Sequence, residues 1–370
     1  MSLLKKCWIT LPKLERNMLN GSKQFRVFAE RIRYSEDRVH GTPIITFPDF
    51  SDIYDHSLRN GLLVGTVTTP KLEDVVEKCC ERLRFPREKV SVFVFASPHI
   101  QATCQSTSEH DCIIQVSSGL MNLLSNDEVM FVIGHELGHH SLQHYLTHVQ
   151  QESLERQMQQ RAQEISVDRL GLVACQNLNT AASAMIKTLS GLNEAHLGSD
   201  IRGFLDQAKA LRKPISGENA RNSHPSLLMR CRALLWFSNV YTETDIASKN
   251  FSEHMLKVNQ RVKDDFEKFV EAPSINFLKG VARNLGMWIA ANKIILKGVF
   301  SKSDQAAFSS LYGKDNLHKF KRLLESSSKK EVVVFIEKKV EENNRHLKSL
   351  VPSSFEGHRR SIINEIDKAF

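Results

Sequence analysis

The sequence lacks any apolar run long enough to cross a membrane. A membrane-spanning helix needs about 18 or more consecutive uncharged apolar residues. The most apolar stretch, residues 275–300, is interrupted by four basic residues, Lys279, Arg283, Lys293 and Lys297. The N-terminal segment "MSLLKKCWITLPKLERNM" is too charged, and its apolar runs are too short, for a secretory signal peptide. We therefore expect a soluble, cytoplasmic protein with no integral membrane span.

Cysteine is scarce and irregularly spaced. The seven cysteines are an odd number without a C-x-x-C pair, and adjacent Cys79 and Cys80 are poor disulfide partners for each other. This pattern excludes the disulfide framework of a small secreted domain and indicates a reducing compartment.

Long blocks of like charge and low-complexity tracts are also absent. The 50 Lys and Arg residues against 42 Asp and Glu give a net charge of +8, spread thinly over 370 residues. A basic face could attract nucleic acid or anionic lipid, but a solvated surface explains so modest an excess, and we expect no nucleic-acid partner. The chain is long enough to bury a large core, and its length predicts two domains.

Periodicity predicts one helix and two strands in the first part of the chain. Apolar residues recur at helical spacing from Pro70 to Leu83. Residues 89–98, "KVSVFVFASP", are β-branched and aromatic and predict a strand. After a polar loop, residues 111–121 predict a second strand that ends at Gly119.

Helices are predicted for most of the remainder. Ser125 and Glu128 have the spacing of a capping box, so a helix should begin there and run to residue 150. The apolar spacing predicts further helices over residues 161–175 and 179–192. Residues 250–370 are helix-patterned throughout, most clearly in "KEVVVFIEKKVEENN".

The helix predicted from Ser125 contains the pattern H-E-x-x-H. His135 and His139 are four residues apart, so both imidazoles project from one helical face and can bind one cation. Glu136 is placed to reach a metal-bound water rather than the metal. Gly134 and Gly138 are unfavourable inside a helix, which indicates that another element packs close to the backbone here.

A helix that is only rich in histidine is the alternative, because H-E-x-x-H also arises by chance. We interpret the other histidines, His140, His144 and His148, as partly exposed helix residues without a ligand role.

A tetrahedral zinc site needs a third protein ligand. Glu164 and Asp168 are four residues apart amid apolar residues, which indicates that both point at something. One carboxylate can bind the metal while the other hydrogen-bonds a ligating imidazole and fixes its orientation. A solvent-facing acidic pair is the alternative.

Three separated motifs together resemble one protein family. H-E-L-G-H at 135–139, E-x-x-x-D-R-L-G at 164–171, and S-H-P-S followed by Arg230 resemble the zinc metallopeptidases that include the CAAX prenyl proteases and HtpX. The resemblance covers roughly residues 70–240 and implies a gluzincin, with two histidines and a glutamate as zinc ligands.

Carried over to this sequence, the resemblance makes His135, His139 and Glu164 the ligands of one zinc ion (Zn2+) per chain. Glu136 matches the general base that acts on a metal-activated water during peptide hydrolysis. Asp168 matches the acid that supports a ligating histidine.

The resemblance also implies substrate contacts. An edge strand around residues 113–117 would line the cleft and pair with an extended peptide or protein substrate. The residues expected to make these contacts are Ile113, Ile114, Gln115 and Val116. Integral-membrane members carry transmembrane helices that this sequence lacks, so we do not expect processing of prenylated proteins within a membrane.

Two residues of the third motif complete the expected site. The resemblance implies that His224 stabilises the oxyanion or takes the place of the water in a resting enzyme, with a surface histidine as the alternative. Arg230 is expected to brace the site through a carboxylate.

The last third faintly resembles the TerB-type helical domains of tellurite-resistance proteins. Asn292, Lys293 and Lys297 stand where such domains often have acidic residues, so we expect no metal there. A role in docking a regulatory partner is the default expectation.

The predicted fold class is α+β and mostly helical, with a zincin-like metallopeptidase domain, a small edge sheet and a C-terminal helical domain. Residues 1–69 are assigned to the N-terminal segment of the catalytic domain, 70–245 to the metallopeptidase domain and 250–370 to the helical domain. The expected function is that of a zinc-dependent endopeptidase, with latency before activation left open. The alternative is a catalytically silent, zinc-bearing interaction or chaperone-like module, from which Glu136 distinguishes a hydrolase.

Overall fold

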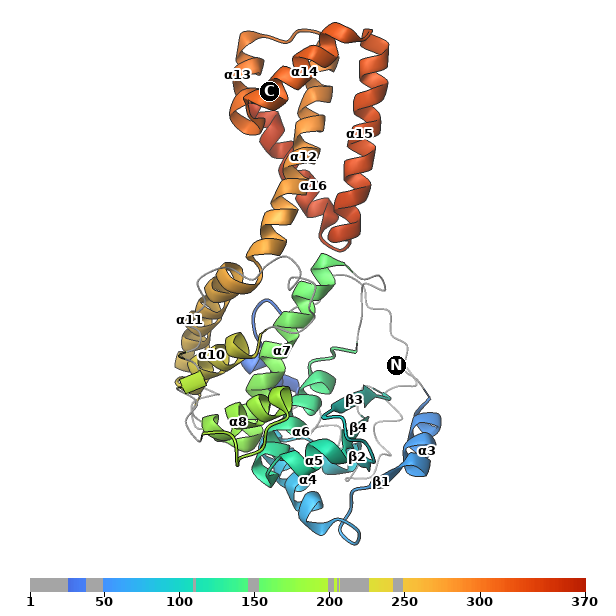
Figure 1. The fold of residues 1–370 in the computed structure, drawn as a ribbon, viewed down its shortest axis with the longest axis vertical. Coiled ribbons are helices and arrows are strands. Elements are labelled where there is room, and N and C mark those ends of the chain that lie inside the picture. Colours follow the sequence, from blue (N-terminus) through green and yellow to red (C-terminus); the bar gives the residue numbers. More distant parts are fainter. Residues whose placement is uncertain are drawn as a thin grey trace, which may run out of the picture.

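The protein is described from a computed structural model. The described residues are 26–37, 49–108, 111–145, 153–198, 203–204, 206, 226–241 and 249–370. They form two parts (Figure 1): a sheet-containing part, residues 26–271, and a bundle of helices alone, residues 272–370, called here the C-terminal bundle. The predicted fold class, a mostly helical α+β protein with a small sheet, is confirmed.

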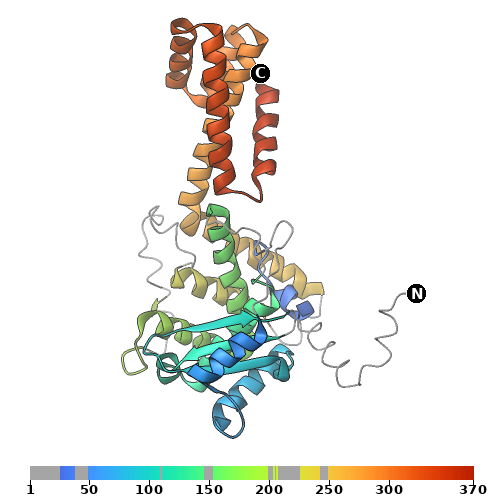
Figure 2. The same ribbon diagram turned by 90° about the vertical axis from the view of Figure 1, so that its right-hand side faces the viewer.

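The helices of the sheet-containing part surround a four-stranded sheet. They are a short helix over residues 26–32, α3 (Phe50–Asn60), α4 (Pro70–Leu83), η1 (Arg87–Lys89), α5 (Ser118–Leu123), α6 (Asn126–Ser141), α7 (Leu154–Cys175), α8 (Leu178–Ser190), α10 (Leu227–Ser238), α11 (Lys249–Asp265) and η3 (Phe266–Val270). Helix α3 covers one face of the sheet, where Tyr54 packs edge-on against Phe93, and α6 packs on the other side (Figure 2).

The sheet has the strand order β1-β2-β4-β3. The strands are β1 (Gly61–Leu63), β2 (Val90–Phe95), β3 (Ala102–Ser106) and β4 (Cys112–Ser117). Strands β2 and β4 are parallel, and the two outer pairs are antiparallel. The two predicted strands are confirmed, but β4 ends at Ser117, whose hydroxyl accepts from the Leu120 backbone N–H and begins α5.

Strand β4 is an interior strand, so the prediction of an edge at residues 113–117 is wrong. Its backbone pairs with β2 on one side and β3 on the other, which leaves no free edge for a substrate. The two outer strands are β1 and β3, and β3 lies in the segment expected to be a polar loop. The four predicted contact residues are also covered: three are buried, and Gln115 donates a hydrogen bond to Ser57 of α3 over 2.9 Å. The buried three are Ile113, Ile114 and Val116.

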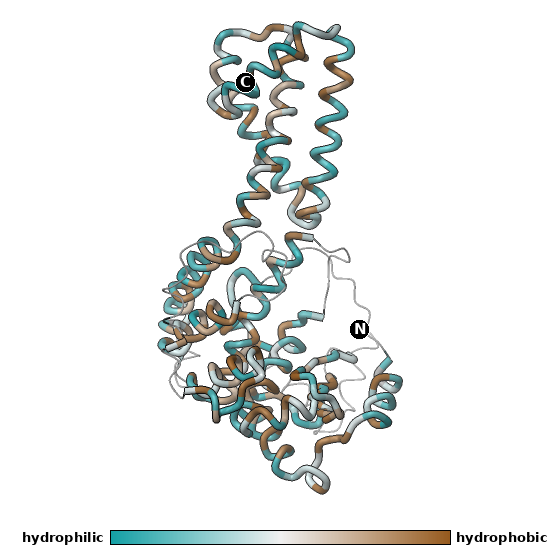
Figure 3. The backbone as a smooth tube through the Cα atoms, in the orientation of Figure 1, coloured by the Kyte–Doolittle hydropathy of each residue, from teal (hydrophilic) through white to brown (hydrophobic). Residues whose placement is uncertain are grey.

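The C-terminal bundle has its own apolar core. It comprises α12 (Ala272–Lys297), α13 (Lys302–Tyr312), α14 (Lys314–Ser326), α15 (Lys329–Leu350) and α16 (Phe355–Ala369). Its core includes Ile294, Phe308 and Ile336. Hydrophilic and hydrophobic residues alternate along these helices (Figure 3), as expected of helices that bury one apolar stripe.

The boundary between the two parts lies later than predicted. The apolar face of α11, including Phe251, Met255 and Val262, packs into the core of the sheet-containing part. The bundle therefore begins at Ala272 and not at residue 250. Within the described ranges, no helix is both long enough and apolar enough to cross a membrane.

Candidate metal centre

Helices α6 and α7 approach each other closely because glycines stand at the contact. A Cβ added to Gly134 would lie 2.5 Å from the Cβ of Ala174. One added to Gly171 would lie 2.7 Å from the ring of Phe131, and one on Gly138 would lie 3.0 Å from α7 side chains. The predicted close packing at Gly134 and Gly138 is confirmed, and the packed element is α7.

Helix α6 begins as predicted but ends early. The capping box is present, since the Ser125 hydroxyl accepts from the Glu128 backbone N–H and the Glu128 carboxylate accepts from the Ser125 backbone N–H. The helix ends at Ser141, and the chain then turns at Gln143, which has φ +59°. The turn brings His144 back toward the helix that precedes it, so the prediction that this helix continues beyond Ser141 is wrong; residues 146–150 lie outside the described ranges.

The α6–α7 contact brings three potential metal donors together. His135 and His139 lie on α6, and Glu164 lies on α7. Their donor atoms all lie within 4.8 Å of one another. Nε2 of His135 is 3.8 Å from Glu164 Oε2, and Nε2 of His139 is 3.6 Å from Glu164 Oε1. Ligands of tetrahedral zinc, with bonds of about 2.0–2.2 Å, stand about 3.3–3.6 Å apart, so this donor set fits the ion with little movement.

Asp168 and Arg230 surround the first histidine and the glutamate. Nδ1 of His135 is 3.1 Å from Asp168 Oδ1, which leaves Nε2 of that ring facing Glu164. Arg230 of α10 donates two hydrogen bonds to Asp168, of 2.8 and 2.6 Å, and its Nη1 is 3.1 Å from Glu164. Arg230 therefore fixes the relative position of the two carboxylates.

The electrostatics of these residues follow from burial and from their neighbours. Burial would raise the pKa of Asp168, but the charge and hydrogen bonds of Arg230, together with those of His135, hold that pKa below its ordinary value. Burial would lower the pKa of His135, but the hydrogen bond to Asp168 and the charge of Glu164 raise it. Burial and the neighbouring histidines lower the pKa of His139 to about 3, which keeps this ring neutral.

The second histidine is held differently from the first. Nδ1 of His139 is 2.9 Å from Nδ1 of His144, and Nε2 of His144 is 3.1 Å from Oδ2 of Asp37. His144 and Asp37 are both buried, with side chains 3% and 0% exposed. His144 as a whole residue is half-buried, which agrees with the prediction of partial exposure, but it lies in the turn after α6, so its assignment to a helix is wrong.

His140 is also buried, contrary to prediction. Its Nδ1 is 2.8 Å from the hydroxyl of Ser106 on β3, and its ring packs edge-on against Phe85. This contact ties the edge strand to α6. His148 lies outside the described residues.

Glu136 is a residue of α6, and its carboxyl faces the outer strand β3. Burial raises the pKa of its carboxyl, while a hydrogen bond from the Cys104 backbone of β3 acts in the opposite direction. The carboxyl is thus close to the metal donors and to β3, whose outer side pairs with no other strand in the described part of the chain. A partly desolvated carboxyl with a raised pKa is suited to accept and return a proton.

The structure reveals two site residues that the sequence did not. Asp37 stands in a region without a clear pattern, and His144 belongs to a turn that was expected to be helix. His144 follows His139 by five residues, and no helical spacing would have paired them. The predicted site residue His224 lies outside the described residues.

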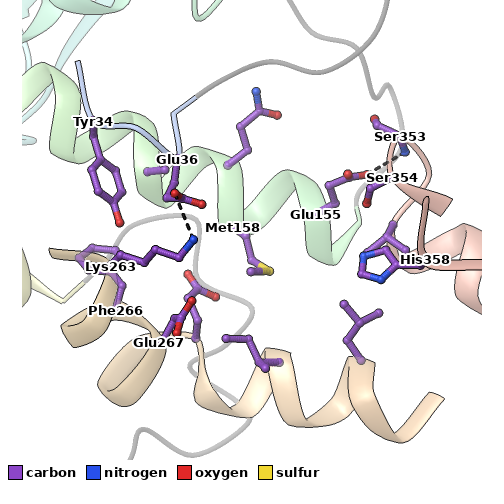
Figure 4. A pocket seen from close by; sticks show the side chains of 16 residues that line it. Tyr34, Glu36, Glu155, Met158, Lys263, Phe266, Glu267, Ser353, Ser354 and His358 are labelled. Atoms are coloured by element: carbon purple, nitrogen blue, oxygen red, sulfur yellow. Dashed lines mark hydrogen bonds and ion pairs between the residues drawn. The ribbon is translucent and has the colours of Figure 1, made fainter. Parts of the chain in front are cut away.

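A separate cavity of about 390 Å³ lies where α7 meets the C-terminal bundle (Figure 4). An ion pair of 3.3 Å between Lys263 and Glu36 stands at one side, and Glu155 accepts a hydrogen bond of 2.8 Å from the Ser353 backbone at the other. None of the three metal donors lines this cavity.

Comparison with known proteins places part of the chain in context. The profile of peptidase family M48 matches residues 66–160. Two curated proteins called "Protease HtpX homolog" are similar over 90 residues, at 32% identity for *Pyrococcus abyssi* and 33% for *Pyrococcus furiosus*. A third, from *Thermodesulfovibrio yellowstonii*, is 32% identical over 76 residues.

These matches cover a limited share of each protein. They include 24% of this chain and 30% of each *Pyrococcus* protein, and 20% of this chain and 26% of the third. The chain thus spans less than a third of the length of the curated relatives it matches. No solved structure matches the chain significantly. The matched segment contains α4, the sheet strands β2–β4 and α6, but neither Glu164 nor Asp37.

Proposed function

We propose, on the premise that residues 66–160 belong to peptidase family M48, the zinc metallopeptidase family of the HtpX type, that this protein is a zinc-dependent endopeptidase. The observation that carries the proposal is the donor set of His135, His139 and Glu164, assembled from two helices with donor atoms within 4.8 Å of one another. Glu136 stands beside this set with a raised pKa.

Each residue has a role that follows from its position. His135, His139 and Glu164 would hold one zinc ion, which when bound would supply a Lewis acid for the scissile carbonyl and the attacking water. Glu136 accepts the proton of that water and returns it to the leaving amine. Asp168 and Arg230 keep His135 and Glu164 in place through the bonds described above.

The substrate is proposed to bind along β3. This strand pairs with β4 on one side, and among the described residues no strand pairs with its other side. Thr103 and Gln105 are exposed on it, and the Cys104 backbone is in contact with the Glu136 carboxyl. An extended peptide that adds to this edge would place its backbone next to Glu136, a known mode of peptide recognition.

The test compares the parent with Glu136→Gln and Glu164→Gln. We expect one zinc per chain in the parent and in Glu136→Gln, with casein cleavage lowered about 10²–10⁴-fold in the latter. Glu164→Gln should lose both the metal and the activity. A parent that binds zinc but cleaves neither casein nor itself contradicts an active peptidase, and a parent without zinc contradicts the metal site.

A zinc-bearing interaction or chaperone-like module is the competing function. A closed structural site would use four protein ligands, whereas three donors are gathered here among the described residues. Under this alternative, Glu136→Gln would change neither zinc content nor any function of the protein.

The C-terminal bundle is proposed to bind a regulatory partner and to act on the site through α7. Arg161 of α7 makes two hydrogen bonds of 2.6 Å to Glu271, the N-cap residue that directly precedes the first helix of the bundle. It stands one helical turn before Glu164 on the same helix. Partner binding that moves the bundle would therefore shift α7 and change the position of Glu164.

We also propose a reducing, cytoplasmic location for the protein. The six described cysteines form no disulfide, which is consistent with this proposal.

A further inference from the structure

A chain of two hydrogen bonds joins His139, the second histidine of the candidate metal centre, to the buried carboxylate of Asp37, far away in the sequence. It runs from His139 Nδ1 to His144 Nδ1, at 2.9 Å, and from His144 Nε2 to Asp37 Oδ2, at 3.1 Å. Since a carboxylate only accepts, His144 must donate through Nε2. In a neutral imidazole Nδ1 then carries no proton and accepts, so the proton of the second bond belongs to His139 Nδ1.

The position of this proton determines which nitrogen of His139 can bind a metal ion. A neutral imidazole carries one proton, so His139 with its proton on Nδ1 presents an unprotonated Nε2. That atom is the one that faces Glu164 at 3.6 Å. The opposite tautomer would place a proton where the metal must bind.

We propose that Asp37 and His144 are positioning residues that hold His139 in the tautomer and ring orientation required for zinc binding. The inference rests on the proposed metal site and extends it, because it makes residues 26–37 part of that site. Asp37 lies outside residues 66–160, the segment matched by family M48.

The segment that carries Asp37 is fixed to the helix of the third donor. The Tyr34 backbone N–H donates to the hydroxyl of Ser166 over 3.0 Å, and Arg169 donates to the Ile32 carbonyl over 3.0 Å. Ser166 and Arg169 both belong to α7, as does Glu164. Asp37 is therefore held at a set position relative to all three donors.

Asp37 also has a counter-ion of its own. Nε of Arg33 is 3.3 Å from Asp37 Oδ2. This pair compensates the buried negative charge, so Asp37 can remain a carboxylate that accepts from His144. His135 is held by the single residue Asp168, whereas His139 depends on two residues from separate parts of the chain.

The first test is zinc affinity, measured by competition with a chromophoric chelator. We expect Asp37→Ala and His144→Leu to raise the zinc Kd about 10–100-fold, the usual effect of removing a hydrogen-bond partner of a ligating histidine. His144→Asn, which keeps an acceptor for His139, should recover part of this loss. His140→Gln alters another buried histidine of the same helix and should leave the Kd within about threefold of the parent.

The second test detects the tautomer directly. Long-range ¹H–¹⁵N spectra of the histidine-labelled, zinc-free protein should show the His139 proton on Nδ1 in the parent. In His144→Leu the two tautomers should mix. The unfolding midpoint of each zinc-free variant separates this effect from a loss of structure.

The outcomes are distinct. A parent that binds zinc, with variants of unchanged Kd and unchanged His139 tautomer, overturns the role of Asp37 and His144 and leaves the proposed function intact. A weakened Kd accompanied by an unchanged tautomer and a matching fall in the zinc-free midpoint shows a purely structural role and also overturns it. A parent that binds no zinc refutes the metal site itself.

Discussion

The two parts of the molecule differ in how many charged residues they bury. The sheet-containing part buries nine charged residues within its described ranges: Asp37, Glu73, Glu128, Arg161, Glu164, Asp168, Arg169, Lys187 and Glu271. Among the residues of the C-terminal bundle, the one buried charge is Asp304, which caps α13. Buried charges cost several kcal/mol each unless they are paired, so their gathering around α6 and α7 indicates a part of the fold organised for chemistry.

The net charge shows the reverse distribution. Residues 272–370 contain 18 Lys and Arg against 10 Asp and Glu, which accounts for the entire net charge of +8. These charges lie on amphipathic helices, where solvent stabilises them. The excess basic charge of the protein thus lies in the C-terminal bundle, whereas nearly all of the buried charges among the described residues lie in the sheet-containing part.

The contact at the junction of the two parts, between α7 and the N-cap residue of α12, should give the largest effect. Arg161 and Glu271 have side chains only 1% and 7% exposed, so Arg161→Met leaves a buried, unpaired carboxylate. We expect a loss of about 3–5 kcal/mol in the free energy of unfolding, measured by urea denaturation. Arg161→Met combined with Glu271→Gln should recover much of the loss. A single variant as stable as the parent would show that this pair does not join the two parts.

The second largest effect should come from zinc removal, which should destabilise the sheet-containing part and leave the C-terminal bundle unchanged. Zinc at about 1,000 times its Kd stabilises a folded site by about 4 kcal/mol. Chelation should therefore speed amide hydrogen exchange in α6 and α7 and leave α13 and α14 unchanged. Equal acceleration in the bundle would mean that the two parts open as a single unit.

The pH dependence of stability should be located in the sheet-containing part. Burial would raise the pKa of Glu128, but hydrogen bonds from Ser183, Ser125 and Lys187 hold it below its ordinary value of 4.5. A carboxyl with a lowered folded pKa stabilises the fold above the unfolded pKa, and this contribution is lost as pH falls through the folded value.

Glu128→Gln tests this dependence, because it leaves Lys187 buried without its partner at 2.9 Å. We expect a loss of about 3 kcal/mol at pH 7, and the difference from the parent should shrink as the pH falls below 4.5. Thermal melts at pH 7 and at pH 3.5 measure it. A difference that stays constant over this interval contradicts the assignment to Glu128.

Glycine substitutions should give the smallest effects, with opposite signs in the two parts. A Cβ at Gly171 would stand 2.8 Å from the Phe131 carbonyl oxygen, so Gly171→Ala should cost about 1–3 kcal/mol by separating α6 from α7. Gly280 of α12 has open space at its Cβ, and Gly280→Ala should stabilise the bundle by about 1 kcal/mol. Two thermal melts compare them. Stabilisation by Gly171→Ala would refute the close helix contact.

The parts of the site that could be predicted are those whose spacing lies within one element. His135 and His139 share a helical face because of a four-residue spacing, and Ser125 with Glu128 marked the helix start. The strand β3 was missed because its residues alternate between exposed and half-buried, so its polar sequence resembles a loop. The edge was then assigned to β4, because a strand order cannot be read from a periodicity.

The sequence by itself determined the chemical groups, the helices that carry them and the glycines that allow α6 and α7 to meet. Helical geometry relates residues four apart, so local spacing is sufficient for these features. Only the tertiary structure decided that Glu164 faces both histidines, that β3 is the outer strand next to Glu136, and that Asp37 reaches His139 through His144. These contacts join residues that are far apart in the chain, and they depend on how buried surfaces and paired charges pack together rather than on any local pattern.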